Sequence, residues 1–169
     1  MYVPKKLQEN FKLIKEEPGT NIIVKGVLSC CGQHDFTILY VGELETNWFG
    51  RKDIFPKGEN TIVLAAKCNV CGNEIEVFNS LTDGYDGVTG GHDDYIDIHS
   101  AISSLEFNTF NCTKCSASNF LINISFEYPD DLENDGIQEY ENAFSSIWIS
   151  PTCTSCKKTY KNLIDMETA

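Results

Sequence analysis

Hydrophobic residues along this chain gather in short runs, most of them rich in β-branched and aromatic side chains that partly alternate with polar ones. The runs lie at residues 11–15, 22–28, 36–41, 61–64, 120–126 and 146–149. Such alternation is typical of strands that bury one face. The turn residues Pro18 and Gly19 separate the first two runs, which are therefore predicted to form a hairpin.

Helical patterns are scarce. Residues 136–144 are the only segment considered for a helix, and the glycine- and aspartate-rich segment 81–92 is predicted to be a loop. With 169 residues, of which 41% are apolar, the chain is large enough for one ordinary domain or two small ones. We therefore predict a mainly β fold with little helix.

Eight cysteines stand in four pairs. Three pairs have Cys-x-x-Cys spacing and the fourth is adjacent: Cys68/Cys71, Cys112/Cys115, Cys153/Cys156 and Cys30/Cys31. No run approaches the roughly 18 apolar residues of a membrane span, and the N-terminal residues do not resemble a secretory signal. We therefore expect a cytoplasmic protein with reduced cysteines, for which metal ligation is a better interpretation than disulfides.

The cysteine pairs belong to a longer repeat. Residues 31–38 align with 115–122, and residues 71–75 align with 156–160. We interpret this as internal duplication of one zinc-ribbon-like module, so that two tandem modules make up the chain.

The expected boundaries follow from the repeat and from the loop between its two copies. The predicted N-terminal zinc-ribbon module, with its leading hairpin, spans residues 1–87. An acidic linker spans residues 88–101, and the C-terminal zinc-ribbon module spans residues 102–169.

Structural zinc takes four ligands in a tetrahedron, and a Cys-x-x-Cys turn presents two sulfurs to one ion. The repeat assigns one site to Cys112, Cys115, Cys153 and Cys156. Cys68 and Cys71 form half of the other site. In register with Cys112 stands Leu28, so the other half remains open between two alternatives, Cys30 with Cys31 or Cys31 with His34.

Both sites are expected to be structural. Four protein ligands leave zinc no open position for water or substrate, so we predict two zinc ions per chain and no catalysis. Each half is small, and metal binding on the order of 10 kcal/mol is then expected to be part of folding.

The charge of the chain is −12, and its distribution is uneven. From Cys68 to Cys156 the chain carries fifteen acidic residues and one basic residue, Lys114. This field repels phosphate and makes nucleic acid an unlikely ligand, whereas a basic protein suits it. The acidic segment 127–141 is either a solvated loop or a docking surface, with possible aromatic anchors at Tyr128, Tyr140, Phe144 or Trp148.

A second acidic cluster lies between the modules. Its members are Asp83, Asp86, His92, Asp93, Asp94, Asp97 and His99. Aspartate and histidine in one loop can bind a further metal, but the spacing does not fit an EF-hand loop. A solvated linker is the favoured interpretation.

Parts of the sequence resemble a known group. Residues 68–75 with 77–80, and 148–150 leading to 153–160, are similar to a family of uncharacterised bacterial proteins with tandem, paired zinc-ribbon modules. The resemblance covers most of the chain from about Cys30 onward. It implies the fold and zinc binding but no function, and the departure at Leu28 and Cys30 leaves the first site's ligand set open.

Three functional hypotheses follow. The leading one is a protein-binding module, for example an immunity or inhibitor protein that caps a basic toxin or nuclease. The alternative is a nucleic-acid-binding zinc ribbon acting in transcription or RNA handling, through Lys5, Lys6, Lys12, Lys15, Lys25, Lys157, Lys158 and Lys161. The third is an enzyme or a redox switch that releases zinc on oxidation. No phosphate loop, nucleophile elbow or His-Glu-x-x-His motif occurs, so no enzymatic activity is predicted.

Overall fold

The computed structural model describes residues 1–56, 61–89, 106–130, 132, 134 and 136–169, and its fold is mainly β, as the sequence predicts. The strands are β1 (Phe11–Glu17), β2 (Asn21–Leu28), β3 (Phe36–Val41), β4 (Glu43–Thr46), β5 (Lys52–Phe55), β6 (Val63–Cys68), β7 (Glu74–Asn79), β8 (Asn108–Thr109), β9 (Phe120–Pro129), β10 (Ser146–Cys153) and β11 (Ile164–Glu167). The helical segments are η1 (Lys5–Leu7), α1 (Gly84–Thr89) and η2 (Tyr140–Asn142).

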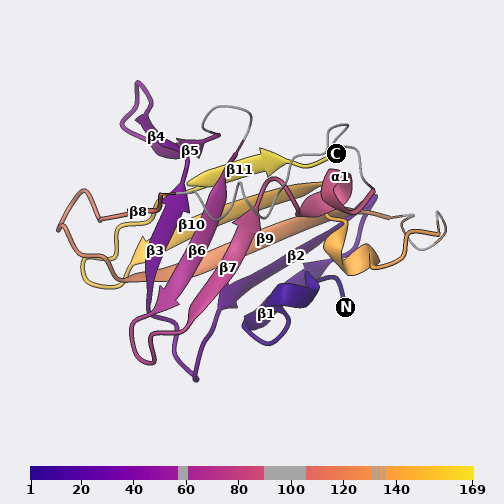
Figure 1. The fold of residues 1–169 in the computed structure, drawn as a ribbon, viewed down its shortest axis with the longest axis horizontal. Coiled ribbons are helices and arrows are strands. Elements are labelled where there is room, and N and C mark those ends of the chain that lie inside the picture. Colours follow the sequence, from indigo (N-terminus) through magenta and orange to yellow (C-terminus); the bar gives the residue numbers. More distant parts are fainter. Residues whose placement is uncertain (57–60, 90–105, 131, 133, 135) are drawn as a thin grey trace.

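Most strands belong to one antiparallel sheet, with the order β1-β2-β9-β3-β6-β7. β10 and β11 branch from β9, β8 pairs with β3, and the β4–β5 hairpin is a separate two-stranded sheet. Figure 1 shows β3, β6 and β7 running across the direction of β9 and β10. The two branches therefore cross, and they enclose the core between them.

The branches meet at one pair of residues. A single bridge joins Phe36 at the start of β3 to Phe120 at the start of β9. Both side chains are completely buried. Each of these residues also pairs with a cysteine at the end of the next strand in its branch, Phe36 with Cys68 and Phe120 with Cys153. The junction of the sheet thus lies directly beside two cysteine pairs.

β9 shows why these residues form a strand at the centre of the fold. Its burial alternates along its whole length, and its inward residues are Phe120, Ile122, Ile124, Phe126 and Tyr128. The rings of Phe126, Tyr128 and Phe144 pack with centroids 5.1 to 6.3 Å apart. One continuous apolar cluster includes residues of every strand of six or more residues except β1, whose partly buried Phe11 packs against it. Metal binding is expected to be part of folding because each half is small, but in the structure both halves also share one large core.

The hairpin predicted for the first two runs is confirmed as β1 and β2, with antiparallel pairing from Phe11 opposite Leu28 onward. Two local predictions are wrong. The predicted loop 81–92 contains the short helix α1, which Gly84 begins with a φ of +82° beside Thr168. The candidate helix 136–144 contains only the three-residue η2, because Gly136 and Glu139 have left-handed backbone conformations, with φ of +69° and +63°, that interrupt a right-handed helix.

Strands from the two proposed modules are interleaved in the sheet. β9, from the range 102–169, lies between β2 and β3, from the range 1–87. β2 pairs with β9 over seven residue pairs, and β3 pairs with β8. The division of the chain into residues 1–87, 88–101 and 102–169 stays a prediction. Most of the proposed linker, residues 88–101, lies outside the described residues. Within the described part of the chain, no helix is long and apolar enough to cross a membrane.

Because the sheet needs strands from both ranges, we predict that residues 1–87 and residues 102–169 do not fold when produced separately. Without β9, β2 and β3 would lose their shared neighbour and expose Phe36, and without β2 one edge of β9 would be bare. Each fragment with zinc should show no cooperative thermal transition and poorly dispersed amide resonances. A fragment that unfolds cooperatively, compared with the full chain as control, would contradict this.

Candidate metal centres

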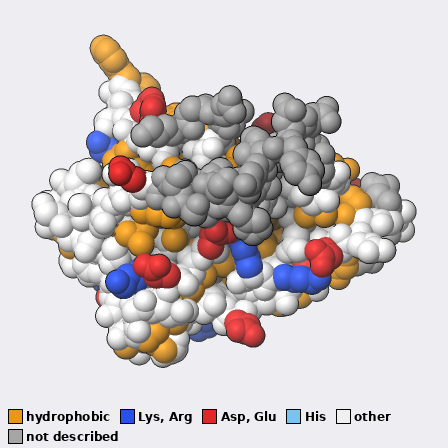
Figure 2. All heavy atoms as spheres, viewed as in Figure 1, with side chains coloured by type: hydrophobic (Ala, Val, Ile, Leu, Met, Phe, Trp, Pro, Cys, Tyr) orange, Lys and Arg blue, Asp and Glu red, His pale blue; other side chains and the backbone are white. Residues whose placement is uncertain are grey.

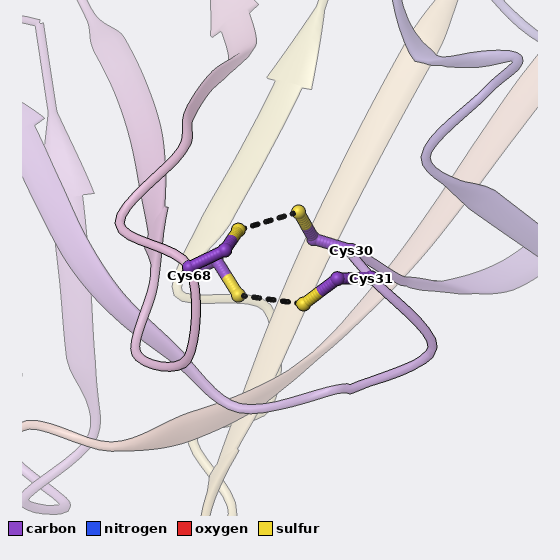
Figure 3. A group of neighbouring side chains, drawn as sticks. Cys30, Cys31 and Cys68 are labelled. Atoms are coloured by element: carbon purple, nitrogen blue, oxygen red, sulfur yellow. Dashed lines mark hydrogen bonds between the residues drawn. The ribbon is translucent and has the colours of Figure 1, made fainter.

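The structure brings the eight cysteines together in two groups of four. One group is Cys30, Cys31, Cys68 and Cys71, and the other is Cys112, Cys115, Cys153 and Cys156. Within each group all four sulfurs lie within 4.8 Å of one another. Figure 3 shows Cys30, Cys31 and Cys68 pointing toward one another from two facing turns. Among the described residues, these are the two groups of side chains arranged to hold a metal ion.

The spacing of the sulfurs fits a tetrahedral thiolate site. In the first centre Cys30 Sγ lies 3.5 Å from Cys71 Sγ, and Cys31 Sγ lies 3.7 Å from Cys68 Sγ. In the second centre the corresponding distances are 3.4 Å and 3.6 Å. Sulfurs at about 2.3 Å from a tetrahedral zinc ion are about 3.8 Å apart. All eight cysteines are free, and their separations far exceed the roughly 2.05 Å of a disulfide.

Backbone hydrogen bonds hold the later turn of each centre, and the two centres use the same ones there. The N–H of Cys68 donates to the carbonyl of Asn73 at 2.8 Å, as Cys153 does to Lys158. Gly72 donates to the carbonyl of Cys68 and Lys157 to that of Cys153, both at 2.9 Å. At this point of the turn Gly72 has a φ of +77° and Lys157 a φ of +65°. The later Cys-x-x-Cys turn therefore has one backbone design in both centres.

The earlier turns differ in length. Cys30 donates to the carbonyl of Gln33 at 2.9 Å, and Cys112 donates to that of Ala117 at 2.8 Å. Cys30 therefore occupies the place of Cys112, with two fewer residues in its turn. The register that puts Leu28 opposite Cys112 is wrong at this point. The shortened turn places Cys31 at a φ of +45°, a left-handed conformation that costs a non-glycine residue about 1 kcal/mol.

His34 takes another role. Its Nδ1 lies 2.9 Å from the carbonyl oxygen of Leu28, where a protonated Nδ1 donates a hydrogen bond. The group of four potential ligands contains Cys30 and not His34. The geometry therefore favours Cys30 with Cys31 over Cys31 with His34.

The thiols in each group influence one another's ionisation. The N–H of Cys71 lowers the pKa of Cys68 to about 7, whereas desolvation and the sulfur of Cys68 raise the pKa of Cys31 to about 12. In the second centre burial raises the pKa of Cys112, but the hydroxyl of Tyr160 and the N–H of Cys115 outweigh it and lower the value to about 6. Four sulfurs this close cannot all carry a negative charge without a cation between them.

Tyr160 supports the second centre from outside the group of cysteines. Its hydroxyl donates to Cys112 Sγ at 3.4 Å and accepts a 2.7 Å hydrogen bond from the N–H of Thr113. Its ring packs edge-on against Phe110, with centroids 5.0 Å apart. The repeat places Ile75 at the equivalent position of the first centre, where Asn73 Nδ2 instead donates to Cys30 Sγ over a longer distance of 4.0 Å. The sequence alignment paired these residues, but nothing in it indicated the contact with sulfur.

The described aspartates of the acidic cluster between the modules, Asp83 and Asp86, are not arranged as metal ligands in the way that the cysteines are. The partly buried carboxylate of Asp83 accepts a 2.7 Å hydrogen bond from the N–H of Asn79 and pairs with Lys6. Neither Asp83 nor Asp86 joins a group of potential metal ligands within the described part of the chain. His92, Asp93, Asp94, Asp97 and His99 lie outside the described residues.

Of the four proposed aromatic anchors, two are core residues, and the other two, Tyr140 and Trp148, are partly buried. Tyr128 and Phe144 are almost completely buried, Tyr128 because β9 turns every second residue inward. Lys5 neutralises part of the segment, with Nζ 2.7 Å from Glu139 and 3.3 Å from Glu141. The most exposed aromatic residues are elsewhere, in the β4–β5 hairpin, which the sequence interpretation missed. Its signal was a pair of aromatic residues between turn formers, Asn47 to Gly50.

Comparison of the chain with family models, with curated proteins and with solved structures finds no match, so its site is interpreted from its own geometry.

Proposed function

We propose that both centres bind structural zinc, and that the protein is a zinc-stabilised, acidic protein-binding module. The observation that carries the first part is the presence of two groups of four cysteine sulfurs at tetrahedral spacing. Soft thiolate ligands in a tetrahedral set select zinc over the oxygen-preferring divalent ions. The four cysteines of each centre would hold the ion, and the backbone hydrogen bonds position the turns that carry them. The ion would neutralise the thiolate charges and cross-link the turns.

Four cysteine ligands fill the coordination sphere of zinc, which supports a structural rather than a catalytic role. Each centre joins turns that are far apart in the sequence, at the ends of β2, β3 and β6 in one case and of β8, β9 and β10 in the other. Metal binding would therefore fix the register of the strands beside Phe36 and Phe120.

The docking role rests on charge. We propose a basic protein as the partner in the cytoplasm, for which an immunity or inhibitor protein that covers a basic toxin or nuclease is the concrete form. Two features weigh against the nucleic-acid alternative. Lys5 and Lys6 are engaged with carboxylates of this chain, and Lys15 and Lys25 both pair with Glu17. These cations would have to leave their partners to reach phosphate.

The zinc proposal predicts two zinc ions per purified chain by elemental analysis. Cys112→Ser should reduce the content to one ion or fewer, because serine does not replace a thiolate ligand. Lys114→Ala, in the same turn but with an exposed side chain, is the matched control and should keep two. Removal of zinc by a strong chelator should lower the melting temperature by at least about 10 °C. Full zinc content in the Cys112→Ser variant would refute the assignment.

The contact of Tyr160 with Cys112 predicts a difference between the centres. Tyr160→Phe keeps the ring packed against Phe110 and removes the hydroxyl, so zinc affinity of the second centre should fall roughly tenfold. Competition with a chromophoric chelator measures this loss of affinity, because one of the two zinc ions should be released at a lower chelator concentration than the other. Ile75→Leu, at the equivalent position of the first centre, controls for altered packing. Equal release of both ions from Tyr160→Phe would show that the hydroxyl does not act on the metal.

The docking proposal predicts that the tagged, zinc-loaded chain retains a basic protein from an extract of its source cells. Binding through complementary charge should weaken when salt is raised from about 0.05 to 0.5 M, because exposed charges are screened. Quantitative mass spectrometry against an untagged control measures the retained proteins. Retention of nucleic acid with no enriched basic protein would favour the alternative function.

A further inference from the structure

The tip of the β4–β5 hairpin exposes two adjacent aromatic side chains. Trp48 is 96% exposed and Phe49 is 91% exposed, far more than any other large apolar residue described. Figure 2 shows this tip as an apolar projection that stands away from the rest of the surface. An exposed aromatic pair of this kind gives no stability to the monomer, and tryptophan in particular is enriched where proteins bind partners.

The backbone of the tip is fixed although its side chains make no contact with the core. Asn47 Oδ1 accepts hydrogen bonds from the N–H of Phe49 at 3.0 Å and of Arg51 at 2.8 Å. The N–H of Gly50 donates to the carbonyl of Asn47 at 2.9 Å, with Gly50 at a φ of +76°. Ile54, at the base of the hairpin, is buried and bonds to the carbonyl of Leu163. The hairpin therefore presents Trp48 and Phe49 from a preorganised turn, which reduces the entropy lost on binding.

The charged side chains of the hairpin indicate what kind of partner surface would fit it. Glu43 and Glu45 are exposed, and neither has an ion pair among the residues that the structure describes. The cations of the hairpin are engaged within it, because Arg51 pairs with Asp53 at 2.9 Å and Lys52 donates to Thr46. The pairing register puts Glu43 opposite Phe55, which is 45% exposed. One face of the hairpin thus combines apolar surface with unpaired carboxylates.

A second copy of the chain and a membrane fit this surface less well. Two copies would bring together chains of charge −12, and an anionic membrane would repel the same charge. Two aromatic side chains alone give little of the buried apolar surface that a stable membrane anchor requires. A protein with an apolar pocket and a basic rim matches both the tip and the free carboxylates.

We propose that the β4–β5 hairpin is the anchor by which this protein binds its partner, with Trp48 and Phe49 inserted in an apolar pocket whose rim carries lysine or arginine. The inference rests on the proposed protein-binding function and adds its contact surface. Glu43 and Glu45 pair with the cations of the rim, and the aromatic pair supplies the contacts that slow dissociation.

Site-specific cross-linking identifies what the tip touches. The full-length chain carrying p-benzoylphenylalanine in place of Phe49 is irradiated in its source cells, and the same residue in place of exposed Ile14 on β1 is the control. The expected result is one cross-linked protein, specific to position 49, attached at an apolar site with Lys or Arg beside it. Cross-links to lipid, to a second copy of the chain or to nothing would overturn the proposal.

Binding of the protein identified in this way then tests the residues. Trp48→Ala with Phe49→Ala should weaken binding at least tenfold and leave the melting temperature within about 1 °C, because both side chains are exposed in the free protein. Glu43→Gln with Glu45→Gln should weaken it several-fold and reduce its salt dependence. Unchanged affinity in the aromatic variant would overturn the hairpin as anchor while the docking function stands. Failure of the chain to retain any basic protein would remove the docking function itself.

Discussion

The arrangement of this protein depends on four sulfur atoms held within 4.8 Å of one another, twice in the chain. Thiolates at this distance repel one another, and a divalent cation between them converts the repulsion into attraction. The turns that carry the sulfurs are attached to the strand ends beside Phe36 and Phe120, where the two branches of the sheet cross. An ion that held the sulfurs together would therefore also help to fix the register at which the branches meet. The shared apolar core extends from this junction.

The sequence predicts much of this structure because its strongest signals are local. Alternation of apolar and polar residues identifies β9 and β10, and Cys-x-x-Cys spacing identifies three turns. The fourth turn, which carries Cys30 and Cys31, was harder to predict. It is two residues shorter than the turn of Cys112 and Cys115, so that Cys30 lies out of the expected register. Tyr128 could have been assigned to the core, since it continues the alternation that begins at Phe120.

Other features depend on contacts between distant residues, and no local pattern encodes them. The pairing of β2 with β9 joins Val27 to Asn123, and the pairing of β3 with β8 joins Leu39 to Thr109. Allowing for the two missing residues, these two pairs are equivalent positions of the repeat. This correspondence supports the interpretation of one unit used twice, in which the leading strand of each unit pairs with a strand of the other. The contact of Tyr160 with Cys112 is likewise visible only when the turns come together.

The interleaving of strands has a consequence for the order in which the chain is made. All four cysteines of the first centre have been synthesised once residue 71 is complete, yet β9, the neighbour of both β2 and β3, follows about 50 residues later. At 5–20 residues per second, roughly 2 to 10 seconds separate the two events. During this interval a nascent chain already has a complete set of ligands for one ion but an unfinished sheet. Early capture of that ion would hold β2, β3 and β6 near one another and shield reactive thiols until the central strand arrives.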